Sequence, residues 1–119
     1  MKALLCRQHG LPDTLEYAQT DDPVPGPGEI VVDMRAAGAN FPDVLIIQNK
    51  YQHKPELPFA PGAEFSGIVS AVGPDVTTRR VGERVMGSVT FGAFAEKVCV
   101  AAERTFVMPP ELDFERGAA

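Results

Sequence analysis

Regularly spaced glycine and proline residues are the feature that most constrains the fold of this 119-residue chain. Each of the two occurs 11 times, and they are spread along the sequence rather than clustered. Because glycine and proline favour turns and interrupt regular structure, this spacing predicts many short strands joined by turns. The length suits a single domain with one core and is too short for two domains.

About seven short strands are expected between these turns. In the segment 30–36 every second residue is apolar, with Asp33 and Arg35 between them, which is typical of a half-buried strand. Gly67, inside another predicted strand, indicates a β-bulge or a close approach of two backbones. Further strands are expected at 1–7, 15–18, 64–72, 84–87, 92–101 and 104–108. Antiparallel strands in this number favour a mainly β fold, a small and partly open barrel.

One short helix is predicted over residues 40–48. Asn40 suits the N-cap position, and Asp43 places a carboxylate three residues later, where the helix dipole favours negative charge. The apolar run 44–47 predicts that the helix is buried. A second helix would begin with Asp113 as its N-cap, but the remaining residues are about half of what an isolated helix needs in water, so we do not expect it to form.

Composition excludes several classes of function. The net charge of −5 argues against a nucleic-acid surface and against binding to an anionic membrane. No apolar run approaches the roughly 20 residues of a membrane span, and the N-terminal apolar run is too short for a signal peptide. With only two cysteines, Cys6 and Cys99, we expect a cytoplasmic protein, and a disulfide between them is the less favoured alternative. His53 lies in a polar loop and is expected to be solvated.

The residues best suited to chemistry lie in the stretch 37–67. Four motifs follow one another in the chain: AGANFPD at 37–43, LPFAPGAEFSGIV at 57–69, VGERV at 81–85 and GAFAE at 92–96. In this order they resemble the N-terminal, GroES-like domain of the medium-chain dehydrogenase/reductases, and the resemblance covers essentially the whole chain. The branch it resembles most is that of the zinc-independent NADPH:quinone oxidoreductases, which include ζ-crystallin.

The residues at the family's zinc positions decide this branch. Zinc-dependent members carry cysteine where this chain has Asn40, and histidine where it has Ala63. Neither an amide nor a methyl group binds Zn²⁺, which prefers thiolate, imidazole or carboxylate. The four-cysteine lobe of those relatives is absent as well. The sequence therefore predicts no metal site, which excludes an alcohol dehydrogenase that relies on a metal-bound alkoxide.

The resemblance also implies roles for single residues. In the family this domain forms one wall of a cleft, and a Rossmann domain that binds NADPH forms the other. Hydride passes from the cofactor to a quinone or a conjugated carbonyl. Asn40 would lie near the nicotinamide ring and the substrate oxygen, with Asp43 as a second catalytic candidate. Tyr51 and Glu64 would contact the substrate, and Leu45, where the family often has tyrosine, would make the pocket more apolar.

Structural roles remain open for the same residues. Asn40 is first of all a good N-cap, and Asp43 suits the first turn of a helix. Tyr51 is more often a packed aromatic residue with its hydroxyl in water. If the family resemblance is set aside, a structural ion pair between Glu64 and an arginine such as Arg84 is the favoured interpretation.

The sequence contains no Gly-x-Gly-x-x-Gly between a strand and a helix, the usual mark of a dinucleotide-binding domain. We therefore expect residues 1–119 to be the GroES-like domain alone, with 113–119 beginning the helix that leads into a missing Rossmann domain. It would be a truncated gene product, a predicted open reading frame or an excised domain.

Two classes of function stay open. The first is the substrate-side domain of an NADPH-dependent quinone oxidoreductase, inactive alone, with enoyl or enal reduction as an alternative and with NADH not separated from NADPH. The second is a non-enzymatic module that binds another protein through its exposed cleft face.

Overall fold

The computed structural model describes all 119 residues, which form seven strands and two short α-helices. The strands are β1 (Lys2–Leu5), β2 (Glu16–Gln19), β3 (Glu29–Gly38), β4 (Glu64–Val72), β5 (Arg84–Ser88), β6 (Lys97–Ala101) and β7 (Thr105–Val107). The helices are α1 (Phe41–Ile46) and α2 (Phe114–Gly117), with 3₁₀ turns at Pro12–Thr14 and Ala102–Arg104. The expected seven short strands are confirmed, although β6 begins five residues later than the predicted strand at 92–101.

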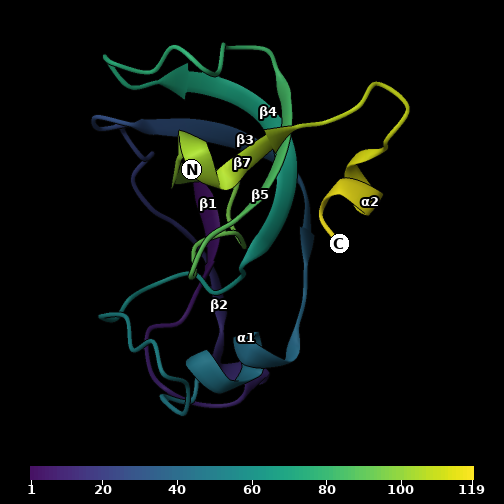
Figure 1. Ribbon diagram of the computed structural model, residues 1–119. Helices are drawn as coiled ribbons and strands as arrows, with labels where there is room; N and C mark the ends of the chain where they lie inside the picture. Colours follow the sequence, from purple (N-terminus) through teal and green to yellow (C-terminus); the bar gives the residue numbers. More distant parts are fainter.

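The strands form two antiparallel sheets that both stay open. β1 and β2 pair with each other, and the larger sheet has the order β6-β3-β4-β5-β7. Figure 1 shows β3 and β4 side by side in the upper half of the molecule, with α1 at the bottom and α2 at one side. The mainly β fold with short helices is therefore confirmed, and its sheets do not close into a barrel. Neither helix is long and apolar enough to cross a membrane.

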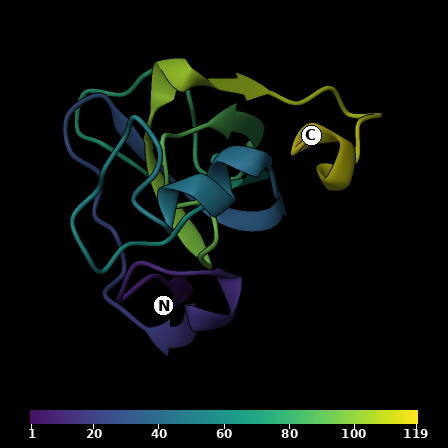
Figure 2. The same ribbon diagram turned by 90° about the horizontal axis from the view of Figure 1, so that it is seen from below.

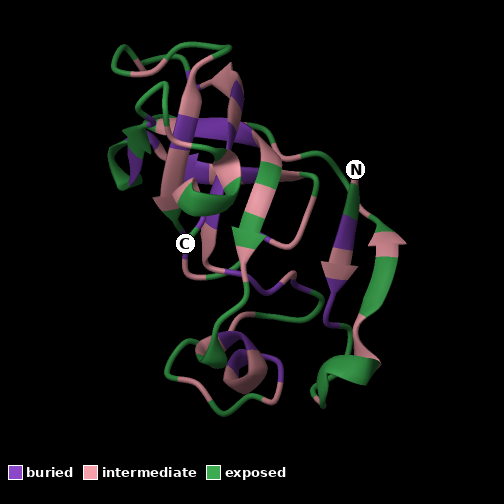
Figure 3. Ribbon diagram, turned by 90° about the vertical axis from the view of Figure 1, so that its right-hand side faces the viewer, coloured by how far each residue is buried: buried purple, intermediate pink, exposed green.

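The main core is built from alternate residues of the large sheet, with Ile30, Val32 and Phe65 fully buried at its centre. Val31 is also buried, so the strict alternation predicted for this strand fails there. The register between β3 and β4 also shifts after Val31, where Ser70 of β4 is left without a partner on β3. Figure 3 shows that burial is concentrated on the large sheet, whereas β2 is mostly exposed.

A second, smaller core lies beneath α1 and fixes this helix to the rest of the chain. It consists of Cys6, Ile46, Ile47 and Phe59, each at most 5% exposed. Its members come from the end of the N-terminal strand, from α1 and from the loop before β4, and Cys6 and Phe59 form an isolated β-bridge. The prediction that the helix is buried is thus confirmed for its Ile46 and Ile47 side.

The helix α2 forms even though it is too short to be stable alone. The Asp113 carboxylate accepts a hydrogen bond from the N–H of Arg116, as expected of an N-cap. The buried Ser66 hydroxyl donates to the carbonyl of Phe114, and the guanidinium of Arg84 lies 4.7 Å from the centre of the Phe114 ring. The expectation that this helix would not form is therefore wrong, because these tertiary contacts supply the stability that an isolated helix lacks.

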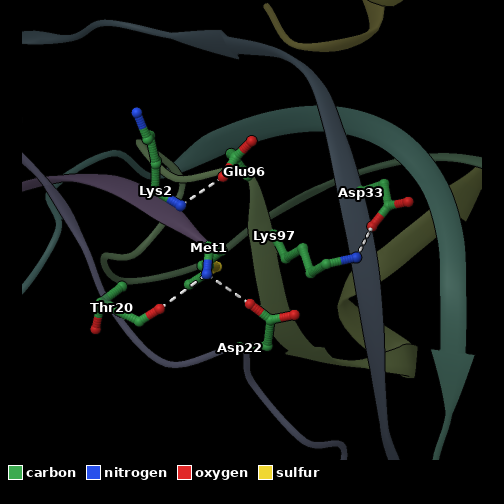
Figure 4. Close-up of polar contacts among 7 residues, drawn as sticks. All are labelled: Met1, Lys2, Thr20, Asp22, Asp33, Glu96 and Lys97. Carbon is green, nitrogen blue, oxygen red and sulfur yellow. Dashed lines mark hydrogen bonds and ion pairs between the residues drawn. The ribbon is translucent and has the colours of Figure 1, made fainter.

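The N-terminus is attached to neighbouring segments by polar contacts (Figure 4). The ammonium group of Met1 donates to the carbonyl of Thr20 at 2.8 Å and to the Asp22 carboxylate at 2.7 Å. The backbone N–H of Lys2 donates to the carboxylate of Glu96. The Met1 contacts join the start of the chain to the residues that follow β2, and the Lys2 contact holds β1 against the segment that precedes β6.

An ion pair joins β3 to β6 in the same region. The Lys97 ammonium lies 2.7 Å from Asp33 Oδ1, and the two residues are directly paired across the strands (Figure 4). The hydrogen bond from Lys97 holds the pKa of Asp33 below its ordinary value, although partial burial opposes this effect. The same hydrogen bond raises the pKa of Lys97.

We expect this pair to make stability depend on pH. A carboxyl group with a lowered pKa in the folded chain stabilises the fold above its unfolded pKa of about 3.9, and this contribution is lost as the pH falls through the folded pKa. Asp33→Asn should therefore lower the free energy of unfolding near neutral pH, by at most about 1 kcal/mol because the pair is partly exposed. In urea denaturation the difference from wild type should shrink between about pH 5 and pH 2. A difference that stays constant with pH would contradict this.

Gly67 is required where β4 passes close to β3. A Cβ atom at this position would lie 2.1 Å from the carbonyl oxygen of Asp33 and 2.7 Å from Cγ1 of Val32. The register between the two strands shifts just beyond this point, between Met34 and Ala36. The sequence predicted either a β-bulge or a close approach of two backbones at Gly67, and both are confirmed.

Gly67→Ala should therefore destabilise the chain by about 2 kcal/mol or more, because backbone must move to admit the methyl group. The matched control is Gly26→Ala, where the nearest atom is the end of the flexible Glu29 side chain at 3.1 Å. Urea denaturation of the two variants measures the difference. Equal stability of the two variants would show that the sheet absorbs the methyl group without strain.

Candidate functional site

A cavity of about 420 Å³ brings together residues of the first two motifs, at 37–43 and 57–69. It lies between α1, the loop that follows α1, the start of β4 and the segments flanking β5 and β7. Its lining consists of Asn40, Pro42, Asp43, Ile46, Tyr51, His53, Ala63, Glu64, Val89, Thr90 and Arg104. Figure 2, which views the molecule from below, shows α1 in front of the strands of the large sheet. Four of the five predicted site residues thus meet in one hollow.

The start of α1 is fixed by Asp43. Its Oδ2 atom accepts the backbone N–H of Asn40 at 2.7 Å, and its own N–H donates to the carbonyl of Asn40 at 3.0 Å. Asn40 is the N-cap residue, and Asp43 acts as the carboxylate of a capping box. Asp43 is only 9% exposed, so this pairing also satisfies a nearly buried charge. The predicted first-turn role of Asp43 is confirmed, and Asn40 stands at the predicted N-cap position.

The side chain of Asn40 is held by Glu64. The Asn40 Nδ2 atom donates to Glu64 Oε2 at 3.0 Å. Because a carboxylate only accepts hydrogen bonds, this contact also fixes which end of the amide faces Glu64. The two residues approach because Glu64, the first residue of β4, pairs with Gly38 at the end of β3, two residues before Asn40.

The alternative of an ion pair between Glu64 and Arg84 is wrong. Glu64 takes part in no ion pair. The Arg84 guanidinium instead donates to the backbone carbonyls of Pro109, Pro110 and Leu112. Arg84 therefore fixes the segment that leads to α2, and Glu64 is left to bind Asn40.

Leu45 does not reach this cavity, contrary to expectation. Successive residues of an α-helix are about 100° apart, so Asp43 and Ile46 share a face while Leu45 lies on another. Ile46 lines the cavity instead and gives it the apolar surface that was expected from Leu45.

Three further polar residues line the cavity, and sequence reasoning placed none of them there. His53 follows α1 and is exposed, and its ring lies 5.7 Å from that of Tyr51, centre to centre. Thr90 follows β5, and Arg104 ends the 3₁₀ turn before β7. They come from three separate loops without a shared motif, so no local pattern signals their convergence.

The cavity offers hydrogen-bonding groups beside a small apolar surface. Asn40, Tyr51 and Thr90 supply neutral polar groups, and Ile46 and Val89 supply apolar contacts. No group of three or more His, Cys, Asp or Glu side chains is arranged to hold a metal ion. A few polar groups beside an apolar surface are the usual lining of a small-molecule site.

Residues 26–110 match the alcohol dehydrogenase GroES-like domain. The chain belongs to this family. The resemblance inferred from the four motifs is confirmed, and it is consistent with the two open sheets and short helices described above.

Two curated relatives of this GroES-like domain illustrate its position in the family. It is 43% identical over 110 residues to quinone oxidoreductase-like protein 2 of Mus musculus, covering 92% of this chain and 31% of that protein. It is also 43% identical over 97 residues to the synaptic vesicle membrane protein VAT-1 homolog of Rattus norvegicus, covering 82% of this chain and 24% of that protein. The chain thus spans about a quarter to a third of the length of these relatives.

A solved structure shows the same fold. The crystal structure of Escherichia coli quinone oxidoreductase complexed with NADPH matches all of this GroES-like domain and 36% of that chain, with 32% identity and a TM-score of 0.94. Its likeness supports the quinone oxidoreductase-like branch among the relatives of this domain.

The hydrogen bond between Asp43 and the Asn40 N–H can be tested directly in this GroES-like domain. Asp43→Ala should cost about 1 kcal/mol in unfolding free energy, the usual loss when a helix cap is removed. The amide hydrogen of Asn40 should also exchange faster with solvent, because it loses its acceptor. Hydrogen exchange followed by NMR measures this change.

Asp43→Asn is the matched control, because its amide keeps an oxygen that can accept the same hydrogen bond. In Asp43→Asn the exchange rate of the Asn40 amide hydrogen should stay closer to that of the wild type. Unchanged exchange in Asp43→Ala would show that the contact does not hold Asn40.

Proposed function

We propose that this GroES-like domain is the substrate-side part of an NADPH-dependent oxidoreductase that reduces a quinone or a conjugated carbonyl without a metal. The observation that carries the proposal is the meeting of Asn40, Asp43, Tyr51 and Glu64 in one cavity. The relatives named as quinone oxidoreductases, one of them crystallised with NADPH, support the same class of reaction.

The residues of the cavity suit the reacting end of a nicotinamide cofactor. Ile46 and Val89 offer apolar surface to a flat ring, and Asn40 offers an amide beside it. The chain has no glycine-rich turn between a strand and a helix for the cofactor's phosphates, so a Rossmann domain would bind that part. When bound, NADPH supplies the hydride.

Asn40 is the residue we expect to orient the reacting oxygen. Its backbone is held by Asp43 and its amide nitrogen by Glu64, so its position is set before a substrate arrives. Groups fixed in advance assist a reaction most, because no rearrangement is needed when charge develops on the substrate oxygen. Asp43 then acts mainly by positioning Asn40, and Tyr51 offers a hydroxyl to the substrate from the loop after α1.

The donor set also favours chemistry without zinc. Asn40 and Ala63 stand at the positions where zinc-dependent relatives have a thiolate and an imidazole, and neither side chain is a zinc ligand. The carboxylate of Glu64 is bonded to Asn40. We therefore propose that hydrogen bonds from the protein, rather than a Lewis acid, polarise the substrate carbonyl.

The isolated chain should not oxidise NADPH in the presence of a small quinone, because most contacts to the cofactor are missing. Joined to the Rossmann domain of a relative, it should do so, and a quinone and an enal supplied in parallel separate the two classes of acceptor. Asn40→Ala in the joined protein should lower kcat/KM by roughly a hundredfold to a thousandfold, as expected for the loss of one oriented hydrogen-bonding group.

Gln52→Ala is the control for this experiment, because Gln52 is exposed in the loop after α1 and does not line the cavity. Its kinetics should match those of the parent protein. Turnover by the isolated chain, or unchanged kinetics of Asn40→Ala, would contradict the proposal.

A further inference from the structure

We propose that Arg104 forms an anion-binding subsite in this cavity, so that the preferred substrates carry a carboxylate, sulfonate or phosphate group on the reducible ring system. This inference rests on the proposed function, because it names the class of substrate for the same site. It starts from the arginine side chains of the chain and the partners that each of them has.

Arg104 is an arginine without a partner that faces the cavity. Four of the seven arginines use their side chains in hydrogen bonds or ion pairs: Arg7, Arg79, Arg84 and Arg116. Arg35, Arg80 and Arg104 form neither kind of contact, and of these three only Arg104 lines the cavity with Asn40 and Tyr51. Its guanidinium keeps five N–H donors that no protein group accepts.

Neither carboxylate of the cavity pairs directly with Arg104. Asp43 accepts the backbone N–H of Asn40, and Glu64 accepts the amide of the same residue. Neither forms an ion pair with Arg104. The acidic groups are therefore committed to positioning Asn40, while the positive charge of Arg104 is available to a ligand.

The backbone on either side of Arg104 is anchored, although the side chain is exposed. Ala102 and Thr105 are 6% and 2% exposed. The Thr105 hydroxyl donates to the Ala102 carbonyl at 2.7 Å, and Arg79 donates to the Thr105 hydroxyl at 3.0 Å. A charge on a fixed turn is better suited to selective binding than one on a loose loop, because less order must be imposed when a ligand arrives.

Further donors and sufficient space lie in the same cavity. Thr90 and His53 line it as well, and each offers a polar group to a bound anion. The volume of about 420 Å³ falls within the range of roughly 300–1,000 Å³ that is usual for small-molecule sites. A guanidinium binds carboxylate, sulfonate and phosphate oxygens through paired hydrogen bonds, which explains the ligand class.

The experiment compares two quinones that differ in charge. The 119-residue chain is titrated with anthraquinone-2-sulfonate and with uncharged 2-(hydroxymethyl)anthraquinone, and NMR shifts give the two Kd values and the residues affected. We expect the sulfonate to bind roughly three- to tenfold more tightly, the range for a partly exposed charge-assisted contact. Both quinones should shift the signals of Asn40 and Tyr51.

Arg104→Ala should bring the ratio of the two Kd values close to one. Arg80→Ala is the matched control: it also removes one exposed arginine, but at a position outside the cavity, so the ratio should stay as in wild type. Raising the salt concentration from about 50 mM to about 500 mM should weaken the binding of the sulfonate to the wild-type chain, but not that of the uncharged quinone, because salt screens the charge pair. This last measurement does not depend on any variant folding.

The outcomes separate the subsite from the proposed function. Equal binding of both quinones to the wild-type chain, with shifts at Asn40 and Tyr51, overturns the subsite and leaves the proposed function standing. Binding of neither quinone overturns the subsite, whereas the proposed function is decided separately by turnover of the joined protein. ADP-ribose 2′-phosphate, the part of NADPH without nicotinamide, is a third probe. Arg104 would belong to the cofactor site if the wild-type chain binds this probe, Arg104→Ala does not, and the wild-type chain shows no preference for the sulfonate. That result would overturn the substrate subsite.

Discussion

The hydrogen bond between Asn40 and Glu64 is the contact on which the arrangement of the cavity depends. It joins the first residue of β4 to the N-cap residue of α1, and so connects the large sheet to this helix. The pairing of Gly38 with Glu64 makes it possible, and a Cβ atom at Gly38 would lie only 3.1 Å from Glu64 Oε2. The backbone geometry of the two longest strands therefore determines where the amide is held.

The residues that cap α1 also line the cavity. The sequence left open whether Asn40 and Asp43 serve as helix caps or as site residues, and the structure shows that the caps themselves line the cavity. Asp43 fixes the backbone of Asn40 by the same contact that satisfies its own nearly buried carboxylate. A substitution of Asp43 would change both the stability of α1 and the position of the Asn40 amide. The change in unfolding free energy must therefore be known before a change in ligand binding or activity is interpreted.

Features set by local chemistry could be predicted from the sequence, and features set by distant contacts could not. The bounds of β4, the capping positions and the close approach at Gly67 follow from residue type and spacing. Leu45, whose role was implied by the family resemblance, does not line the cavity because it lies on another side of the helix than Asp43 and Ile46. His53, Thr90 and Arg104 meet only through the tertiary fold, and α2 exists only because Ser66 and Arg84 bind it.

Before a ligand binds, the polar groups of the cavity thus form two sets, one with hydrogen-bond partners in the chain and one without. Around Asn40 each carboxylate already has a hydrogen-bond partner within the chain, which rigidifies that wall. The guanidinium of Arg104, which lines the same cavity, has no hydrogen-bond or ion-pair partner. A ligand that pairs with Arg104 need not break any contact of Asn40, because the two networks share no bond. A substitution of Arg104 should therefore leave the geometry around the Asn40 amide unchanged, since sites without shared partners contribute almost independently.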